Sequence, residues 1–255
     1  MSRPFVLLTN DDGVQAAGLY ALVSVLRESC DLAVVAPEHN WSASGHAKTM
    51  HKPLRVTEVR LADGSSALAT NGSPSDCVAM CLLGLLDRRP DLVISGINLG
   101  ANVGHDLTYS GTVSAAMEAI IGGVSAIAIS VDSYTPVPFE PAAEFCRELA
   151  RHVLQIPLEE PLLLNVNVPA LPRNAIRGVQ ITRLGRRIYR DKLIRRTDPR
   201  GRSYYWIGGD PPQGIPEEGT DIGALHRGLI SVTPVALDLT DEARLSLLRS
   251  WDLGF

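Results

Sequence analysis

The chain has 255 residues, of which 45% are hydrophobic and 20% are charged, a balance typical of a globular protein with a sizeable core. Its 24 Lys and Arg against 28 Asp and Glu give a net charge of −4, which argues against general nucleic-acid binding. No apolar run reaches the roughly 18 residues that a membrane helix needs, and the first residues lack a signal-peptide pattern. We therefore expect a cytoplasmic protein with reduced cysteines, no membrane partner and no stable nucleic-acid partner.

The first part of the chain has the pattern of a βαβ unit followed by two further strands. A continuous apolar run over 5–9 predicts a buried strand, because parallel sheets are covered on both faces. Apolar residues at helical spacing follow over 19–26, and a second buried strand is predicted at 32–36. Alternating residues predict a half-exposed strand at 54–60, and a short strand follows at 67–70.

The same alternation of strands and helices continues to about residue 170. Ser73 fits a helix N-cap, Pro74 fits the first helical position, and Asp76 lies in the first turn. We therefore expect an α/β fold with a doubly wound, mostly parallel sheet. The elements predicted in this part are helices at 74–86, 113–121 and 141–154, and strands at 91–95, 125–131 and 162–168.

After Pro172 the pattern changes to strands with no clear helix between them. We interpret 180–230 as a β-rich extension, with a turn at Asp198-Pro199-Arg200-Gly201, and 241–251 as a closing amphipathic helix. The chain is thus expected to form one domain. Its parts are an α/β core (1–175), a protruding arm (176–235) and the closing helix (236–255); the strands expected in the arm are 179–184, 203–207 and 229–235.

The arm carries an excess of positive charge. It is expected to be a solvated arm or an oligomer contact, and the alternative is a surface that attracts a phosphate-rich partner. The basic residues are Arg183, Arg186, Arg187, Arg190, Lys192, Arg195, Arg196, Arg200 and Arg202.

Four polar loops are expected to meet at the carboxyl edge of the sheet, where open α/β sheets bind ligands. They are 10–13, 38–45, 96–104 and 108–112. Together they contain carboxylates, hydroxyls, amides and a helix start: Asp11, Asp12, Ser42, Ser44, Asn98, Asn102, Ser110, Gly111 and Thr112.

This set of residues favours a metal-dependent phosphatase. Two adjacent carboxylates repel each other unless a cation lies between them, and hard oxygen ligands suit Mg²⁺, Mn²⁺ or Ca²⁺. The helix start at Thr112 suits an oxyanion such as phosphate. A cation facing such a helix start would support phosphoryl transfer to water.

Simpler interpretations stay open for each piece. Asp11-Asp12 can end a strand in a polar turn, Asn98 and Asn102 can be turn residues, and Ser42 can be a cap. Two other functions also fit paired acids: a metal-dependent nucleotidyl or glycosyl transferase, and a regulatory module that binds a nucleotide without changing it.

Several motifs of the chain resemble those of the survival protein SurE family, and the resemblance covers nearly the whole length. The motifs are Thr9-Asn10-Asp11-Asp12-Gly13, Val35-Ala36-Pro37, residues 90–98, Tyr109-Ser110-Gly111-Thr112-Val113, Asp198-Pro199-Arg200-Gly201, Tyr205-Trp206-Ile207-Gly208 and Gly219-Thr220-Asp221.

The resemblance implies a divalent-metal-dependent phosphatase that acts on nucleoside monophosphates at the 5′ and often the 3′ position, and that in some members trims polyphosphate. It also implies a Rossmann-like core, a protruding C-terminal β-hairpin, and a homodimer or homotetramer built by exchange of C-terminal elements. One Mg²⁺ or Mn²⁺ per subunit is expected.

By position, the metal ligands of the family fall on Asp11, Asp12, Ser42 and Asn98. The phosphate site falls on Asn102 and Ser110-Gly111-Thr112, and we count Asn10 and Ser44 among the substrate contacts. Asp11 and Asp12 are the expected catalytic residues. Metal-bound water, or alternatively a carboxylate, is expected to attack phosphorus.

The chain departs from the usual family pattern at a few positions. Ser42-Ala43 stands where Ser-Gly is usual, and His105 stands where a second acid is usual. Ala17 replaces a proline, and Ser73-Pro74 replaces Thr-Pro. The changes at Ala43 and His105 bear on loop geometry and substrate preference.

Overall fold

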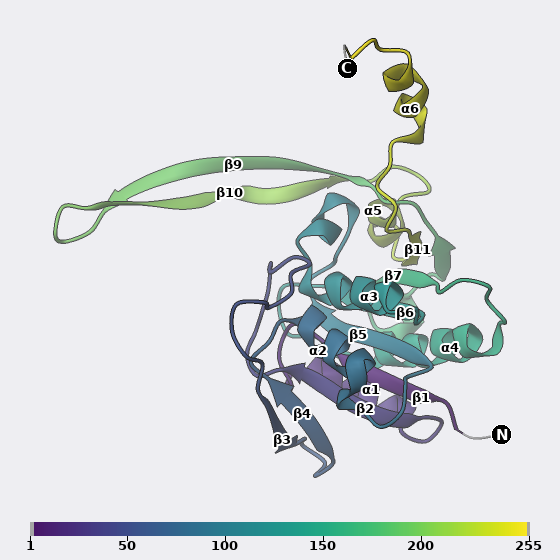
Figure 1. Cartoon of the computed structure of the whole chain (residues 1–255). Coiled ribbons are helices and arrows are strands. Elements are labelled where there is room, and N and C mark those ends of the chain that lie inside the picture. The colour runs from purple at the N-terminus through teal and green to yellow at the C-terminus, as the bar shows by residue number, and fades with distance from the viewer. Residues whose placement is uncertain (1–2, 254–255) are drawn as a thin grey trace.

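The computed structural model, which describes residues 3–253, is built on a nine-stranded sheet of order β3-β4-β2-β1-β5-β6-β7-β11-β8 (Figure 1). The pairs β3–β4 and β7–β11 are antiparallel and the other neighbours are parallel, which confirms the predicted fold class. The strands are β1 (Phe5–Thr9), β2 (Asp31–Pro37), β3 (Val56–Arg60), β4 (Ser66–Thr70), β5 (Leu92–Leu99), β6 (Ala126–Asp132), β7 (Leu163–Pro169), β8 (Val179–Ile181) and β11 (Ile230–Val235).

Helices cover both faces of this sheet. Alternate residues of β1 serve opposite layers: Val6 and Leu8 join the core beneath α1 and α4, whereas Leu7 joins the core beneath α2 and α3. A strand buried on both faces has no polar alternation, which is why its sequence is a continuous apolar run. The helices are α1 (Ala17–Leu26), α2 (Pro74–Met80), α3 (Gly111–Ile121), α4 (Glu140–Gln155), α5 (Asp221–His226) and α6 (Glu242–Arg249), with short turns η1 (Cys81–Leu85), η2 (Gly104–Thr108) and η3 (Arg173–Ala175).

The start of α2 follows its sequence signature. The Ser73 hydroxyl accepts a hydrogen bond from the Asp76 N–H at 3.1 Å, and the Asp76 carboxylate accepts one from the Ser73 N–H at 2.8 Å. This reciprocal pair satisfies two backbone donors that the first turn leaves open. The α-helix ends at Met80 and continues as the π-helical turn η1.

All four cysteines of the chain are free and buried.

The glycine-rich segment after residue 95 is partly strand, not only loop. β5 runs on to Leu99, and its register against β6 shifts between Ser95 and Asn98. Gly96 has φ +139°, and a Cβ there would lie 2.3 Å from the Ile129 carbonyl oxygen. Only glycine fits this close approach, and the shift places Asn98 at the carboxyl edge of the sheet.

Within the predicted arm (176–235), only β9 (Arg186–Thr197) and β10 (Ser203–Ile215) form a long two-stranded antiparallel hairpin that projects from the body (Figure 1). The expected bounds were too wide, because β8 and β11 belong to the main sheet. The expectation that no helix lies between the C-terminal strands is wrong, because α5 precedes β11. The Thr220 hydroxyl accepts from the Gly223 N–H at 3.0 Å and caps this helix. With six residues, α5 is too short to show helical periodicity, so its only sequence signal is the cap Thr220-Asp221.

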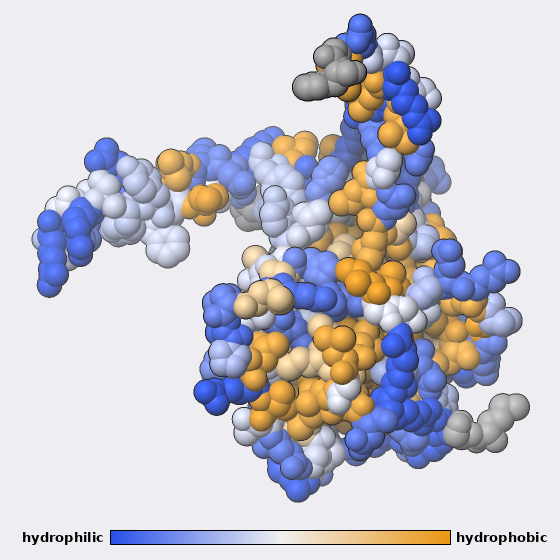
Figure 2. All heavy atoms as spheres, viewed as in Figure 1, coloured by the Kyte–Doolittle hydropathy of each residue, from blue (hydrophilic) through white to orange (hydrophobic). Residues whose placement is uncertain are grey.

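The C-terminal helix α6 forms where a helix was expected, but it does not close the core of the single chain. It has no buried residue, and Leu247 and Leu248 are 54% and 47% exposed. Figure 1 shows it standing away from the sheet, and Figure 2 shows apolar surface on it and on the arm. No helix within residues 3–253 is long and apolar enough to cross a membrane.

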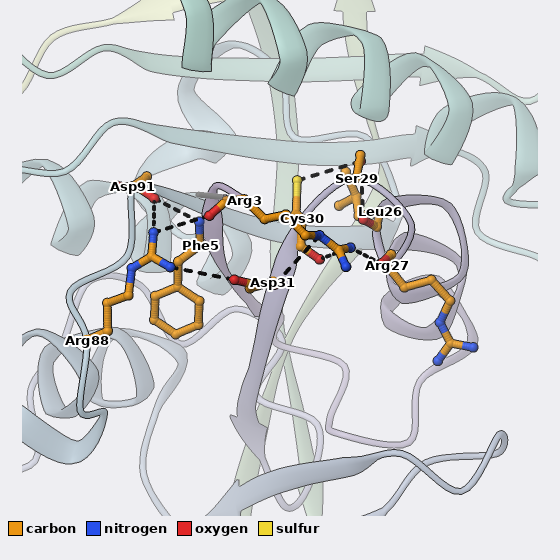
Figure 3. A network of polar contacts seen from close by, with 9 residues as sticks. All are labelled: Arg3, Phe5, Leu26, Arg27, Ser29, Cys30, Asp31, Arg88 and Asp91. Atoms are coloured by element: carbon orange, nitrogen blue, oxygen red, sulfur yellow. Dashed lines mark hydrogen bonds and ion pairs between the residues drawn. The ribbon is translucent and has the colours of Figure 1, made fainter. Parts of the chain in front are cut away.

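The amino edge of the sheet is held by ion pairs (Figure 3). Arg88 pairs with Asp91 at 2.9 Å and with Asp31 at 3.6 Å, and Arg3 also pairs with Asp31 at 3.6 Å. The Arg88 guanidinium lies 5.2 Å from the centre of the Phe5 ring. These contacts join the starts of β1, β2 and β5, so the charges at this edge neutralise one another.

Gly96 gives a direct test of this packing. We expect Gly96→Ala to lower the free energy of unfolding by more than about 3 kcal/mol, because the new methyl group meets backbone. The matched control is Gly64→Ala. Gly64 also has a left-handed φ, +81°, but nothing lies within 4 Å of its Cβ position. The control should cost only about 1–2 kcal/mol of strain. Equal urea midpoints for the two variants would contradict the close approach.

Candidate metal and phosphate site

Asp11 lies at the end of β1, with 4% of its surface exposed, against the start of α3. The Thr112 hydroxyl donates to Asp11 Oδ1 at 2.6 Å. A Cβ on Gly111 would lie 2.7 Å from the Asp11 Cβ, so the helix start can reach the acid only because residue 111 is glycine. Burial raises the pKa of Asp11, and hydrogen bonds from the Thr112 side chain and backbone oppose that rise.

Asp12 is less buried and stands beside a like charge. Burial, and then the charge of Asp11, raise the pKa of Asp12 to about 6. The Leu99 N–H and the Asn40 side-chain amide, which donates at 3.1 Å, partly offset this rise. No cationic side chain among residues 3–253 lowers the pKa of either acid. The two carboxylates therefore form an uncompensated acidic pair.

The loop after β2 is tied to this pair. The Trp41 N–H donates to the Asp11 carbonyl at 2.8 Å, and the Ser42 hydroxyl and N–H donate to Asn40 Oδ1 at 2.6 and 2.8 Å. Asn40, which connects Ser42 to Asp12, was not predicted as a site residue. Its only signal was an amide within the hydroxyl-rich loop. The Ser44 hydroxyl is buried and has no hydrogen-bond partner within the described part of the chain.

Asn102 is fixed by polar side chains from β6 and β7. Its N–H donates to Asn167 Oδ1 at 2.8 Å, and its carbonyl accepts from the side chains of Asn165 and Asn167, each at 2.9 Å. Its own side-chain amide donates to the Ser130 hydroxyl at 2.9 Å. This buried network fixes the loop after β5, and neither Asn165 nor Asn167 was predicted as a site residue.

A cleft of about 380 Å³ lies over these elements. Half of the ten predicted site residues line it: Asp11, Ser42, Asn98, Asn102 and Ser110. Asp12 adjoins it through Leu99, which is also part of the wall.

Asn10, Ser110 and Thr112 each have hydrogen-bond partners within the protein itself. The side chain of Asn10 exchanges hydrogen bonds with the Gly13 backbone at 2.9 and 3.2 Å and closes the turn after β1. Ser110 caps α3 by accepting from the Val113 N–H at 3.1 Å, and Thr112 binds Asp11. The start of α3 thus holds a carboxylate of the protein itself. The assignment of these residues as phosphate contacts stays a prediction.

The donor set fits a hard divalent cation. It combines two carboxylates with the Ser42 hydroxyl and the Asn98 amide, whose nitrogen donates to the Gly100 carbonyl at 2.7 Å. Among the described residues, no three His, Cys, Asp or Glu side chains cluster in a way that could hold a metal. A cation here would therefore rely on the acid pair and neutral oxygens, and it would relieve the repulsion between the acids.

Comparison with known proteins identifies the family of this chain. The model of the family described as "Survival protein SurE" matches residues 6–191. The chain belongs to the SurE family. It is 54% identical over 238 residues to the 5'-nucleotidase SurE of Herpetosiphon aurantiacus, covering 92% of this chain and 93% of that protein. It is 52% identical over 252 residues to the 5'-nucleotidase SurE of Chloroflexus aggregans, covering 97% and 99%.

The structure of this chain is also similar to a solved structure. The crystal structure of the SurE protein from Aquifex aeolicus matches with a TM-score of 0.83 at 38% identity, covering 96% of this chain and 98% of that one. The family expected from the motifs is thereby confirmed. One departure from the SurE pattern has a local meaning: Ala43, in the cleft wall, has φ +57°, a conformation that glycine adopts with less strain.

The acid pair predicts a gain in stability when one charge is removed. Because the pKa of Asp12 is raised in the folded protein, its ionisation costs stability; this cost grows between pH 3.8 and about 6 and is constant above. In EDTA at pH 7.5, Asp12→Asn should therefore be more stable by about 1 kcal/mol or more, a Tm rise of roughly 2–4 °C. The difference should vanish near pH 4. A lower Tm at pH 7.5 would contradict an uncompensated pair.

The Asn102 network predicts unequal effects of two similar substitutions. Asn167→Ala leaves the buried Asn102 N–H without an acceptor, whereas Asn165→Ala leaves the Asn102 carbonyl bound to Asn167. Asn167→Ala should cost about 1–3 kcal/mol more in the free energy of unfolding. It should also speed hydrogen exchange over 98–104. Equal losses in urea denaturation would show that the network does not fix this loop.

Proposed function

We propose that the protein hydrolyses nucleoside 5′-monophosphates to nucleoside and phosphate with one divalent cation, Mg²⁺ or Mn²⁺, per subunit. The observation that carries the proposal is the uncompensated pair Asp11-Asp12 in a cleft with neutral oxygen donors. The relatives described above are named 5'-nucleotidases, which supports the substrate class. Activity at the 3′ position and trimming of polyphosphate are finer parts of the same proposal.

The residues of the cleft have different roles in this reaction. Asp11, Asp12, Ser42 and Asn98 would hold the cation, which when bound neutralises phosphate charge and lowers the pKa of water. Thr112 holds the Asp11 carboxylate in place, and Asn40 does the same for Asp12. Because both carboxylates are held in position before substrate binds, they need little further ordering to reach the transition state.

Phosphate would lie in the cleft beside the acids. Asn102 and Ser110 line the same cleft, and each is fixed by hydrogen bonds to its surroundings. Neutral donors suit a dianion whose charge the cation already offsets. Water is the acceptor of the phosphoryl group, which distinguishes this proposal from the transferase alternative.

We also propose that the chain assembles into a homodimer or homotetramer by exchanging C-terminal elements. Leu247, Leu248 and Trp251 are about half exposed at the C-terminal helix, and Trp206 and Ile207 are exposed on the hairpin arm. A two-stranded hairpin is marginally stable alone, so further contacts would stabilise it.

Phosphate release from AMP with water as the only acceptor tests the proposed reaction. We expect release with Mg²⁺ or Mn²⁺, loss of release in EDTA, and at least about a 100-fold lower rate in Asp11→Asn. Asp87→Asn, at an exposed position outside the cleft, is the matched control.

Three results would count against the proposal. Asp11→Asn that still turns over AMP with chelator present would exclude the acid pair as the metal site. Release that requires an organic acceptor would favour a transferase. AMP that binds with metal and is recovered unchanged would favour a regulatory module.

A further inference from the structure

Two tyrosines stand in the wall of the same cleft without a part in the metal or phosphate chemistry. Tyr109 precedes the cap of α3 and is 64% exposed, and Tyr134 follows β6 and is 75% exposed. Asp11 and Asn98 line the same cleft. The cleft therefore combines a polar part, formed by acids and amides, with exposed aromatic surface.

The Tyr134 ring is held in position from two sides. A Cβ at Gly100 would lie 3.4 Å from a carbon of this ring, so the ring covers the loop after β5. Its hydroxyl interacts with the guanidinium of Arg187, whose side chain is 12% exposed. An exposed ring that is fixed at its edge and its tip is a ready stacking surface, because little side-chain entropy is lost on binding.

Arg187 also connects this ring to Asp106, another residue of the cleft. It forms an ion pair with Asp106, which lines the cleft near Tyr109, and the Tyr189 hydroxyl donates to the same carboxylate. The Asp106 carboxylate is thus committed to two partners from β9. It therefore has little remaining capacity to accept hydrogen bonds from the polar edge of a nucleobase.

We propose that Tyr109 and Tyr134 form a stacking wall for the nucleobase of the substrate, while the phosphate lies at the Asp11 end of the cleft. The inference rests on the proposed function and adds the part of the site that binds the base. A cleft of about 380 Å³ is within the range of small-molecule sites. Stacking tolerates every base and increases with ring area, so the site accepts all bases and favours purines over pyrimidines.

The test compares AMP with ribose 5-phosphate, which carries the same phosphate ester without a base. In Tyr134→Ala, the ratio of kcat/KM for AMP to that for ribose 5-phosphate should fall about 5- to 150-fold. In Tyr134→Phe, which keeps the ring, the ratio should stay within about twofold of wild type. Tyr109→Ala should lower the ratio in the same way, and the preference for AMP over UMP should shrink in both alanine variants.

The outcomes separate this inference from the proposed function. If wild-type protein releases phosphate from AMP but the alanine variants leave the ratio unchanged, the stacking wall is overturned and the proposed function stands. An equal loss for AMP and ribose 5-phosphate overturns it as well, since the rings would then act on the phosphate end. If wild type hydrolyses neither compound with Mg²⁺ or Mn²⁺, the proposed function fails, and the inference fails with it.

Discussion

The hydrogen bond between Asp11 and Thr112 joins the two halves of the candidate site, which lie 101 residues apart in the chain. It sets the end of β1 against the start of α3, and Gly111 allows the contact. The helix start offers a positive dipole end, which offsets part of the cost of burying a carboxylate there. The rest of the cleft is arranged around this contact, since Asp12, the loop containing Ser42 and the end of β5 all approach the same acid.

Acidic residues have opposite electrostatic surroundings at the two edges of the sheet. At the amino edge, Asp31 and Asp91 are paired with Arg3 and Arg88 (Figure 3). At the carboxyl edge, no cationic side chain among residues 3–253 pairs with Asp11 or its neighbour, and the pKa values of both acids rise. The strand β1 reaches both edges. The difference in charge pairing therefore comes from the residues around its two ends and not from the strand itself. Ion pairing stabilises the acids at the amino edge, whereas the acid pair at the carboxyl edge costs stability that a bound cation would restore.

The sequence predicted most of the core because its signals are local. A continuous apolar run identified β1, and the Ser73-Pro74-Asp76 start identified α2. The site was predicted down to its loops because parallel strands end at one edge. The helix α5 was missed because six residues are too few for a period, and only Thr220 marks it.

The supporting residues of the site could not be predicted from the sequence. Asn167 lies 65 residues from Asn102, and Arg187 lies 81 residues from Asp106. Nothing local distinguishes Asn167 from another polar residue of a strand, because its role exists only once β7 lies beside the loop. Asn10 shows the reverse case. Its position beside the acids suggested a substrate contact, yet its side chain is used by the turn at Gly13.

The basic residues of the arm differ in their contacts along its length. Arg187, at its base, is nearly buried against the cleft, whereas Arg202 pairs within the hairpin tip with Asp198 and is largely exposed. A count of charges treats these residues alike, but only the first is coupled to the site. Because β9 carries both Arg187 and Tyr189, the position of the hairpin base determines where Asp106 and Tyr134 lie. Contacts that fix the hairpin base would therefore also fix one wall of the cleft.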